Sequence, residues 1–138
     1  MRPFDVEKRL ERARIPVFYG PLPDGIHGLS YKESGLMVIV ISDLLSRVEQ
    51  RCALFHEYFH LALFNAETFG FKDAYADRLS GDKVETAVRR ATAKALVPRG
   101  LLYRRLRQGA SHHEIAEEMD VTVDVLEDAI ELLIRRKA

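Results

Sequence analysis

The sequence predicts a single α+β domain, in which a small three-stranded β-sheet packs on one long helix and the C-terminal half is helical. The chain has 138 residues and is 47% hydrophobic, which suits one compact domain with its own core. Runs typical of strands lie before residue 42, and helical patterns follow them. We therefore expect a sheet region over residues 1–45, helices that carry the functional site over 46–97, and a C-terminal helical subregion over 98–138.

The first segments predict a supporting helix and an initial strand. Residues 5–14 are charged apart from a narrow apolar stripe, which predicts a short surface helix. Residues 15–19 are β-branched and aromatic and predict a strand. Residues 20–25 contain too many Gly and Pro residues for a regular element, so we expect a loop there.

A β-hairpin should complete the sheet. Residues 26–31 and 36–41 both read as strands, and the connector over residues 32–35 ends in Gly35, which can take a positive φ. The second of these strands is apolar throughout, as is typical of a central strand. We expect it to lie in the middle of the sheet.

One long helix should follow the sheet. Ser42 and Asp43 can cap its start, and apolar residues then recur at steps of three and four until about Phe64. The apolar positions are Leu45, Val48, Cys52, Phe55 and Phe59.

The rest of the chain predicts more helices. Residues 65–81 have weak periodicity and contain Gly70 and Gly81, so we expect a loop with a helical turn near residues 74–79. A helix should then cover residues 82–97 and end at Pro98. The remaining expected helices are 101–107, one that begins at Ser111 with a capping box, and 122–136.

Composition excludes several classes of protein. Lys plus Arg and Asp plus Glu both number 21, so no net field favours nucleic acid or an anionic membrane. The longest apolar run, residues 36–41, is far shorter than the roughly 20 residues of a spanning helix. Cys52 has no partner for an internal disulfide, and the N-terminus does not resemble a signal peptide. We expect a cytoplasmic protein that is not integral to a membrane.

The motif that carries chemistry is H-E-x-x-H over residues 56–60, inside the long predicted helix. His56 and His60 are four residues apart and share one helical face, so both rings can reach one cation. Glu57 lies next to them and can act as a base toward water. Polar groups in so apolar a helix need partners, and a metal supplies one. The alternative is a chance match in which both histidines are merely hydrogen-bonded. The pattern predicts a zinc site, although another divalent metal could bind.

A catalytic zinc site usually takes three protein ligands, so one more must come from elsewhere. Glu85 is favoured because a following helix places a ligand more rigidly than a loop does. Asp82 and Glu85 also fit a capping box, in which Glu85 would only satisfy a backbone N–H. The full set of candidates for the third ligand is Glu67, Asp73, Asp77, Asp82 and Glu85.

These features resemble the ImmA/IrrE family of small metallopeptidases, which are encoded mostly in prophages, mobile elements and stress-response loci. The resemblance rests on the strand over residues 36–41 before the H-E-x-x-H helix, on Glu85 followed by the L-V-P of residues 96–98, and on the S-x-x-E-I-A pattern of residues 111–116. It implies a zincin-like fold, a zinc-dependent peptidase and a substrate that is a helix-turn-helix transcriptional repressor.

The sequence departs from the family pattern after Glu85. The family usually has Ala-Asn or Ala-Asp and then Phe-Ala, where this chain has V-R at residues 88–89 and A-T at residues 91–92. Arg89 cannot accept a hydrogen bond, whereas a metal-bound histidine normally donates its second ring N–H to an acceptor. Another group must fill that role, or the third ligand is displaced.

In the expected reaction, Glu57 takes a proton from water and passes it to the leaving nitrogen. A further group should stabilise the oxyanion, and the sequence does not choose among the available side chains. For His112 and His113 an ordinary position in the first turn of a helix is favoured over a role in the site. The candidates are His27, Tyr58, Tyr75, Tyr103, His112 and His113.

Two other functions compete with the peptidase. Residues 111–134 could form a DNA-binding helix-turn-helix, but they carry eight acidic residues and neither Lys nor Arg, which phosphate repels. The basic block over residues 89–107 is expected to pair with this acidic block instead. A metal-stabilised protein that binds a repressor without cutting it is the third possibility, and Glu57 argues against it because a structural site needs no base. A protein substrate could add a strand along residues 26–31.

Overall fold

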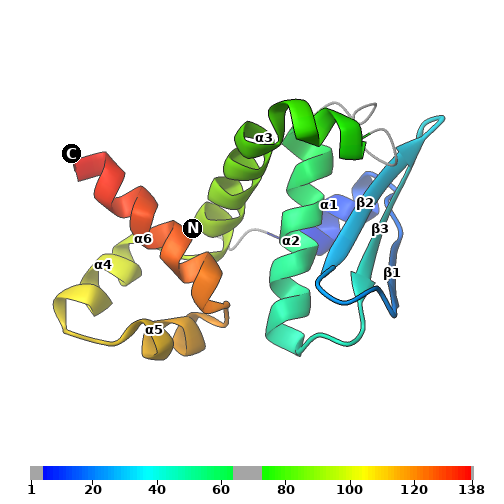
Figure 1. Cartoon of the computed structure of the whole chain (residues 1–138). Helices are drawn as coiled ribbons and strands as arrows, with labels where there is room; N and C mark the ends of the chain where they lie inside the picture. Colours follow the sequence, from blue (N-terminus) through cyan, green and yellow to red (C-terminus); the bar gives the residue numbers. More distant parts are fainter. Residues whose placement is uncertain (1–4, 64–72, 138) are drawn as a thin grey trace.

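The strands of the N-terminal region form the sheet that supports the site. In the computed structural model, which describes residues 5–63 and 73–137, these strands are β1 (Val17–Gly20), β2 (Gly28–Glu33) and β3 (Leu36–Ser42). The sheet order is β1-β3-β2, with β1 parallel and β2 antiparallel to β3 (Figure 1). The central position expected for the apolar strand is confirmed, and β1 and β2 each begin two residues later than predicted.

The hairpin between β2 and β3 has a tighter turn than the sequence predicts. Lys32 and Glu33 pair with β3 residues, so only Ser34 and Gly35 remain in the turn. Both take a positive φ, 51° and 84° respectively, as a two-residue turn of type I′ requires. The positive φ expected for Gly35 is confirmed.

Helix α2 (Arg47–Leu63) packs against the sheet and carries the H-E-x-x-H motif. Ile39 and Ile41 of β3 are fully buried beneath it, and α1 (Val6–Arg12) also contacts it. The cap expected at Ser42 and Asp43 is wrong. Ser46 forms the start of the helix, because its Oγ accepts from Glu49 N at 3.2 Å and its N–H donates to Glu49 Oε1 at 3.0 Å.

Helix α3 (Asp73–Leu96) lies beside α2 and is longer than predicted. Of the loop expected over residues 65–81, residues 65–72 lie outside the described residues and residues 73–81 are helical, so Gly81 lies within the helix rather than interrupting it. Glycine in a helix interior costs only about 1 kcal/mol relative to alanine, which the packing of a long helix can offset. Asp82 therefore does not start a helix.

The C-terminal half consists of α4 (Arg99–Arg107), α5 (His112–Met119) and α6 (Val123–Lys137). The capping box at Ser111 is confirmed, and Asp120 adopts a left-handed conformation with φ 59° between α5 and α6. Helix α6 packs on α3, on the side away from the sheet (Figure 1). These three helices share one core with α2 and the sheet. The fold is α+β, as the sequence predicts.

The pairing expected between the basic and acidic blocks is confirmed at two places. Arg89 of α3 binds Asp128 of α6, and Arg105 of α4 binds Glu118 of α5. Among the described residues, no helix combines the length and the apolar character that crossing a membrane requires.

Candidate metal centre

Helix α2 presents the H-E-x-x-H side chains on the face that lies between the sheet and α3. The Nε2 atoms of His56 and His60 are 3.2 Å apart, as expected for two side chains separated by one helical turn. The His60 side chain is only 9% exposed and that of His56 is 27% exposed. The helix therefore brings both ring nitrogens to one point at the edge of the core.

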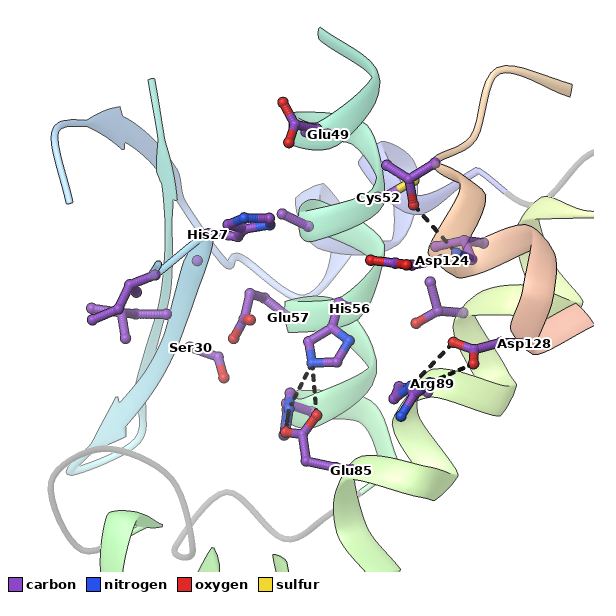
Figure 2. A pocket seen from close by; sticks show the side chains of 18 of the residues that line it. His27, Ser30, Glu49, Cys52, His56, Glu57, Glu85, Arg89, Asp124 and Asp128 are labelled. Atoms are coloured by element: carbon purple, nitrogen blue, oxygen red, sulfur yellow. Dashed lines mark hydrogen bonds and ion pairs between the residues drawn. The ribbon is translucent and has the colours of Figure 1, made fainter. Parts of the chain in front are cut away.

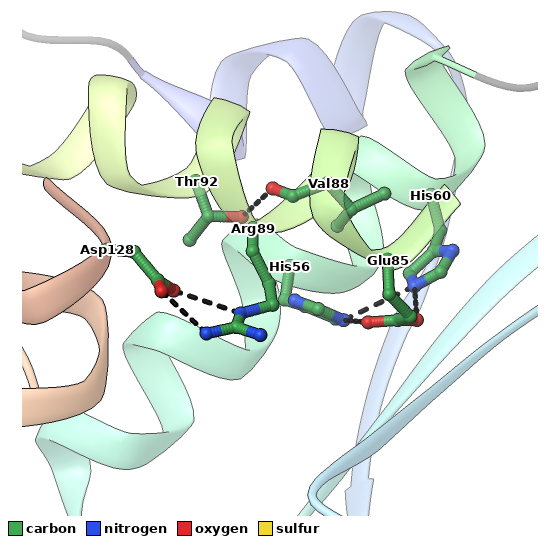
Figure 3. A network of polar contacts seen from close by, with 7 residues as sticks. All are labelled: His56, His60, Glu85, Val88, Arg89, Thr92 and Asp128. Carbon is green, nitrogen blue, oxygen red and sulfur yellow. Dashed lines mark hydrogen bonds and ion pairs between the residues drawn. The ribbon is translucent and has the colours of Figure 1, made fainter. Parts of the chain in front are cut away.

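Helix α3 brings Glu85 to the same point (Figure 3). Glu85 Oε1 lies 2.8 Å from His60 Nε2, and Oε2 lies 3.2 Å from His56 Nε2. These contacts hold the pKa of Glu85 well below its usual range, so its carboxylate is ionised. The capping-box alternative is wrong, because Glu85 lies twelve residues after the first residue of α3, Asp73.

The three side chains fit a divalent cation. Their ligand atoms all lie within 4.8 Å of one another, so the group could hold a metal ion. Zinc bonds of about 2.0–2.1 Å place tetrahedral ligand atoms about 3.3–3.4 Å apart, close to the 3.2 Å between the ring nitrogens. If both Nε2 atoms carried protons toward Glu85, those two protons would crowd each other. A shared cation would instead accept lone pairs from all three groups.

Glu57 leaves α2 on the side that faces the sheet. It is 8% exposed, and burial raises the pKa of its carboxyl group, whereas the neighbouring His56 and His60 lower it. Gly28 of β2 lies so close that a Cβ on it would be 3.0 Å from Glu57 Cγ. The base candidate is therefore held against β2, beside the donor set.

A cleft of about 770 Å³ opens onto these residues (Figure 2). One side is formed by the first part of β2 and the loop before it, and the floor by α2. The other side is formed by α3 and by the start of α6. A peptide segment can enter such an open groove and reach the donor set.

The family model described as the IrrE N-terminal-like domain matches residues 10–131. The chain belongs to this peptidase family. No curated protein matches the chain closely enough to extend the comparison. The family indicates a metallopeptidase, and it agrees with the resemblance that the sequence motifs carry.

In this member of the family, Arg89 contacts an acid rather than a histidine. Its Nε and NH2 groups donate to the two carboxylate oxygens of Asp128, at 3.1 Å and 2.6 Å (Figure 3). This ion pair raises the pKa of Arg89. Thr92, at the second departure, donates its hydroxyl to the Val88 carbonyl within α3 at 2.8 Å. Arg89 therefore joins α3 to α6 beside the donor set.

The other candidates from the sequence are distributed unevenly. Among the proposed oxyanion groups, His27 lines the cleft, whereas Tyr58 is buried in the core. Tyr103 is on α4, where it contacts Arg107. Five candidates cannot be placed: Glu67 lies outside the described residues, and Asp73, Tyr75, Asp77 and Asp82 lie in α3 where the side chains are not described. His112 and His113 are exposed in the first turn of α5.

Three residues of the cleft were not singled out from the sequence. Gly28 lies close to Glu57, Ser30 lines the same side of the cleft, and Asp128 binds Arg89. The sequence does point to the first two. Gly28 and Ser30 are small residues two positions apart in a predicted strand, so their side chains lie on the same face of the sheet. The partner of Arg89 gives no comparable local signal.

Proposed function

We propose that the chain is a zinc-dependent endopeptidase that hydrolyses a peptide bond in a protein substrate. The observation that carries this proposal is the arrangement of a buried carboxylate, Glu57, beside three converging metal-ligand side chains in an open cleft. Membership in a peptidase family supports it. A purely structural metal site would need neither the cleft nor the extra carboxylate.

In this proposal His56, His60 and Glu85 hold the metal. Two neutral nitrogens and one carboxylate suit zinc, and another divalent cation could replace it. The metal, when bound, acidifies a water molecule and polarises the scissile carbonyl group. The Glu85 carboxylate would also balance part of the positive charge of the metal.

Glu57 acts as the general base and then as the general acid. Its carboxylate takes a proton from the attacking water as the new C–O bond forms, and gives that proton to the amide nitrogen as the C–N bond breaks. Its position one residue after His56 keeps it beside the donor set throughout. Burial excludes competing water from this carboxylate.

The outer edge of β2, which has no strand partner among the described residues, is proposed to bind the substrate backbone. Ser42 N donates to His27 O at 2.9 Å, so in this antiparallel register the alternate residues of β2 direct their backbone groups away from β3. Those residues are Gly28, Ser30 and Lys32. A substrate strand added at this edge would run along the cleft.

The proposed substrate is a helix-turn-helix transcriptional repressor of a phage or mobile element, cleaved in the cytoplasm. This part of the proposal rests on the family resemblance. Direct DNA binding by this chain is not favoured, because α6 packs on α3 and its Asp128 is engaged by Arg89 of the same chain.

The test is incubation of the zinc-loaded chain with the repressor encoded beside its gene, with and without a chelator. We expect defined fragments that disappear with the chelator and return when zinc is added back. A stable complex without fragments would instead support the non-catalytic binder. Salt-sensitive binding to duplex DNA, without cleavage or complex formation, would support a regulatory DNA-binding protein.

A further inference from the structure

We propose that Arg89 binds a backbone carbonyl group of the substrate, from the side of the cleft opposite β2. The inference rests on the proposed function, since it assumes that a peptide segment occupies the cleft. It assigns a role to a side chain that the reaction at the donor set does not use.

Arg89 lies beside the donor set. It follows Glu85 by four residues in α3, so the two side chains share one face of the helix, with their Cβ atoms about 5–6 Å apart. Both residues line the cleft. Figures 2 and 3 view the site from different directions, and both show the Arg89 guanidinium between Asp128 and His56. A peptide that reaches the donor set therefore passes next to this guanidinium.

Asp128 fixes the direction in which the guanidinium faces. Its two carboxylate oxygens accept from Arg89 Nε at 3.1 Å and from Nη2 at 2.6 Å. A guanidinium is planar and carries five N–H donors, so one that binds a carboxylate along one edge still presents Nη1 on another. Among the described residues, Nη1 makes no hydrogen bond or ion pair. It is a donor of fixed orientation at the side of the cleft.

A substrate strand added to β2 needs donors on its far side. The backbone N–H and C=O groups of successive residues point alternately to the two edges of a strand, so only half of them can pair with β2. The other half point across the cleft toward α3 and α6, where a carbonyl group shielded from water needs a partner. Carboxylates only accept hydrogen bonds, so Arg89 is the charged donor among the described side chains of this wall. The charged side chains concerned are Glu85, Arg89, Asp124 and Asp128.

The charges around Arg89 favour a neutral acceptor over an acidic side chain. Asp128 already neutralises the guanidinium, and Asp124, four residues earlier on α6, lines the same cleft. A substrate carboxylate at Nη1 would approach both acids, and like charges repel each other. A carbonyl oxygen carries only a partial charge, so it gains the hydrogen bond with little of that repulsion. Arg89 is therefore suited to bind the main chain of the substrate.

The test measures peptide binding separately from turnover. The zinc-loaded full chain with Glu57→Gln selects binders from a random-sequence peptide library, and elution with a chelator keeps those that bind next to the metal. The Kd of the tightest binder is measured by fluorescence anisotropy. We expect Arg89→Ala, added to Glu57→Gln, to weaken binding roughly tenfold, near the lower end for a hydrogen bond to a charged group. Zinc content should not change, because the three donors remain.

Arg89→Ala in the otherwise wild-type chain should raise KM for the same peptide by a similar factor. Its kcat should stay within about twofold, because the contact is present in the ground state and the transition state alike. Arg105→Ala is the matched control. Arg105 also binds an acid, Glu118 at 2.9 Å, but it is not among the residues that line the cleft. Its replacement should leave both Kd and KM within about twofold.

A thioamide scan of the peptide identifies the acceptor. Sulfur accepts hydrogen bonds more weakly than a carbonyl oxygen does, and a thioamide keeps its N–H group. One thioamide should weaken binding to the protein that retains Arg89 and have no effect on Arg89→Ala, as a direct contact requires. The absence of any position with this coupling would contradict a backbone contact.

Asp128→Asn distinguishes a carbonyl group from an acidic side chain as the acceptor. If Nη1 binds a carbonyl group, loss of the carboxylate that orients the guanidinium should weaken binding about threefold. If Arg89 binds an acidic side chain instead, removal of the competing charge should tighten binding. Tighter binding by Asp128→Asn, or a Kd within twofold of the parent in Arg89→Ala, would overturn the proposal.

Cleavage of the selected peptide by the zinc-loaded wild-type chain tests the proposed function on its own. If the peptide binds through Arg89 but is never cleaved, the peptidase proposal fails and the binding role stands. If the peptide is cleaved and Arg89→Ala changes neither Kd nor KM, only the binding role fails. A library that yields no binder eluted by the chelator would overturn both.

Discussion

Across the cleft, the sheet side contributes small neutral residues, Gly28 and Ser30, whereas the helical side contributes an ion pair, Arg89 with Asp128. On the sheet side, Gly28 lies against Glu57, and a Cβ at Gly28 would be only 3.0 Å from Glu57 Cγ. The helical side joins two helices through side chains of which Arg89 is 57% exposed. The energetic cost of adding an atom to a closely packed site rises steeply with its volume, whereas water weakens the attraction within an exposed ion pair. Steric changes on the sheet side should therefore affect turnover far more than charge changes on the helical side.

Removal of the group that the sheet side supports should have the largest effect. Glu57→Gln keeps the shape of the side chain but cannot accept a proton, so we expect kcat to fall by at least about 100-fold while zinc stays bound. His60→Ala should lose zinc as well as activity, because it removes one of the three converging donors. Zinc content by atomic absorption, measured beside cleavage rate, distinguishes the two classes. Loss of zinc from Glu57→Gln would instead make Glu57 a ligand.

The next effect is steric. Gly28→Ala places a Cβ 3.0 Å from Glu57 Cγ, so we expect kcat to fall by roughly 10- to 100-fold with zinc retained. Gly20→Ala is the control, since nothing lies within 4 Å of a Cβ at the end of β1. Equal activity of the two alanine variants would show that β2 can move away from α2 at no cost to the base.

The sequence predicts the part of the site that lies within one helix. His56, Glu57 and His60 follow from helical spacing alone, because residues four apart share a face whatever the tertiary structure is. Glu85 could be either a ligand or a cap, and that choice depended on where α3 begins. The sequence suggested a start at Asp82 because Gly81 reads as a break, whereas packing carries the helix through it from Asp73.

Contacts between elements were harder to predict. The hairpin and the central place of β3 followed from turn chemistry and hydrophobicity. The close approach of Gly28 to Glu57 depends on which face of β2 meets α2, and a shift of one residue in register would reverse that face. Asp128 is 39 residues from Arg89, and no local pattern links them. Tertiary packing alone brings such pairs together.

A moderate effect on stability is expected at the helical side. Asp128→Asn removes the charge that binds Arg89, and we expect a loss of about 1 kcal/mol in the free energy of unfolding. Thermal denaturation should show a melting temperature lower by roughly 3–5 °C. Glu118→Gln, which breaks the pair with Arg105 outside the cleft, is the control. The kcat of both variants should stay within about twofold of wild type, and a tenfold loss in Asp128→Asn alone would mean that the helical side also takes part in catalysis.

The smallest effect should come from an ion pair remote from the cleft, between Arg47 at the start of α2 and Asp120 in the turn before α6. The hydrogen bond from Arg47, at 2.5 Å, lowers the pKa of Asp120 below its usual range. Folding therefore favours the ionised carboxylate, and this contribution to stability is present above the unfolded pKa of about 3.9 and is lost as the pH falls through the folded pKa.

Asp120→Asn should consequently flatten the fall in stability below about pH 4, because the variant has no proton to gain there. Asparagine tolerates the left-handed conformation at φ 59°, and the backbone carbonyl still accepts from Arg51 NH1, so the turn itself should persist. Urea denaturation of both proteins at pH 7, 4 and 3 measures the difference. High salt should reduce it, since both side chains are exposed and their interaction is screened. Parallel pH profiles for the two proteins would show that the ion pair contributes nothing to the free energy of unfolding. Exposed ion pairs would then differ even more from the closely packed sheet side of the cleft.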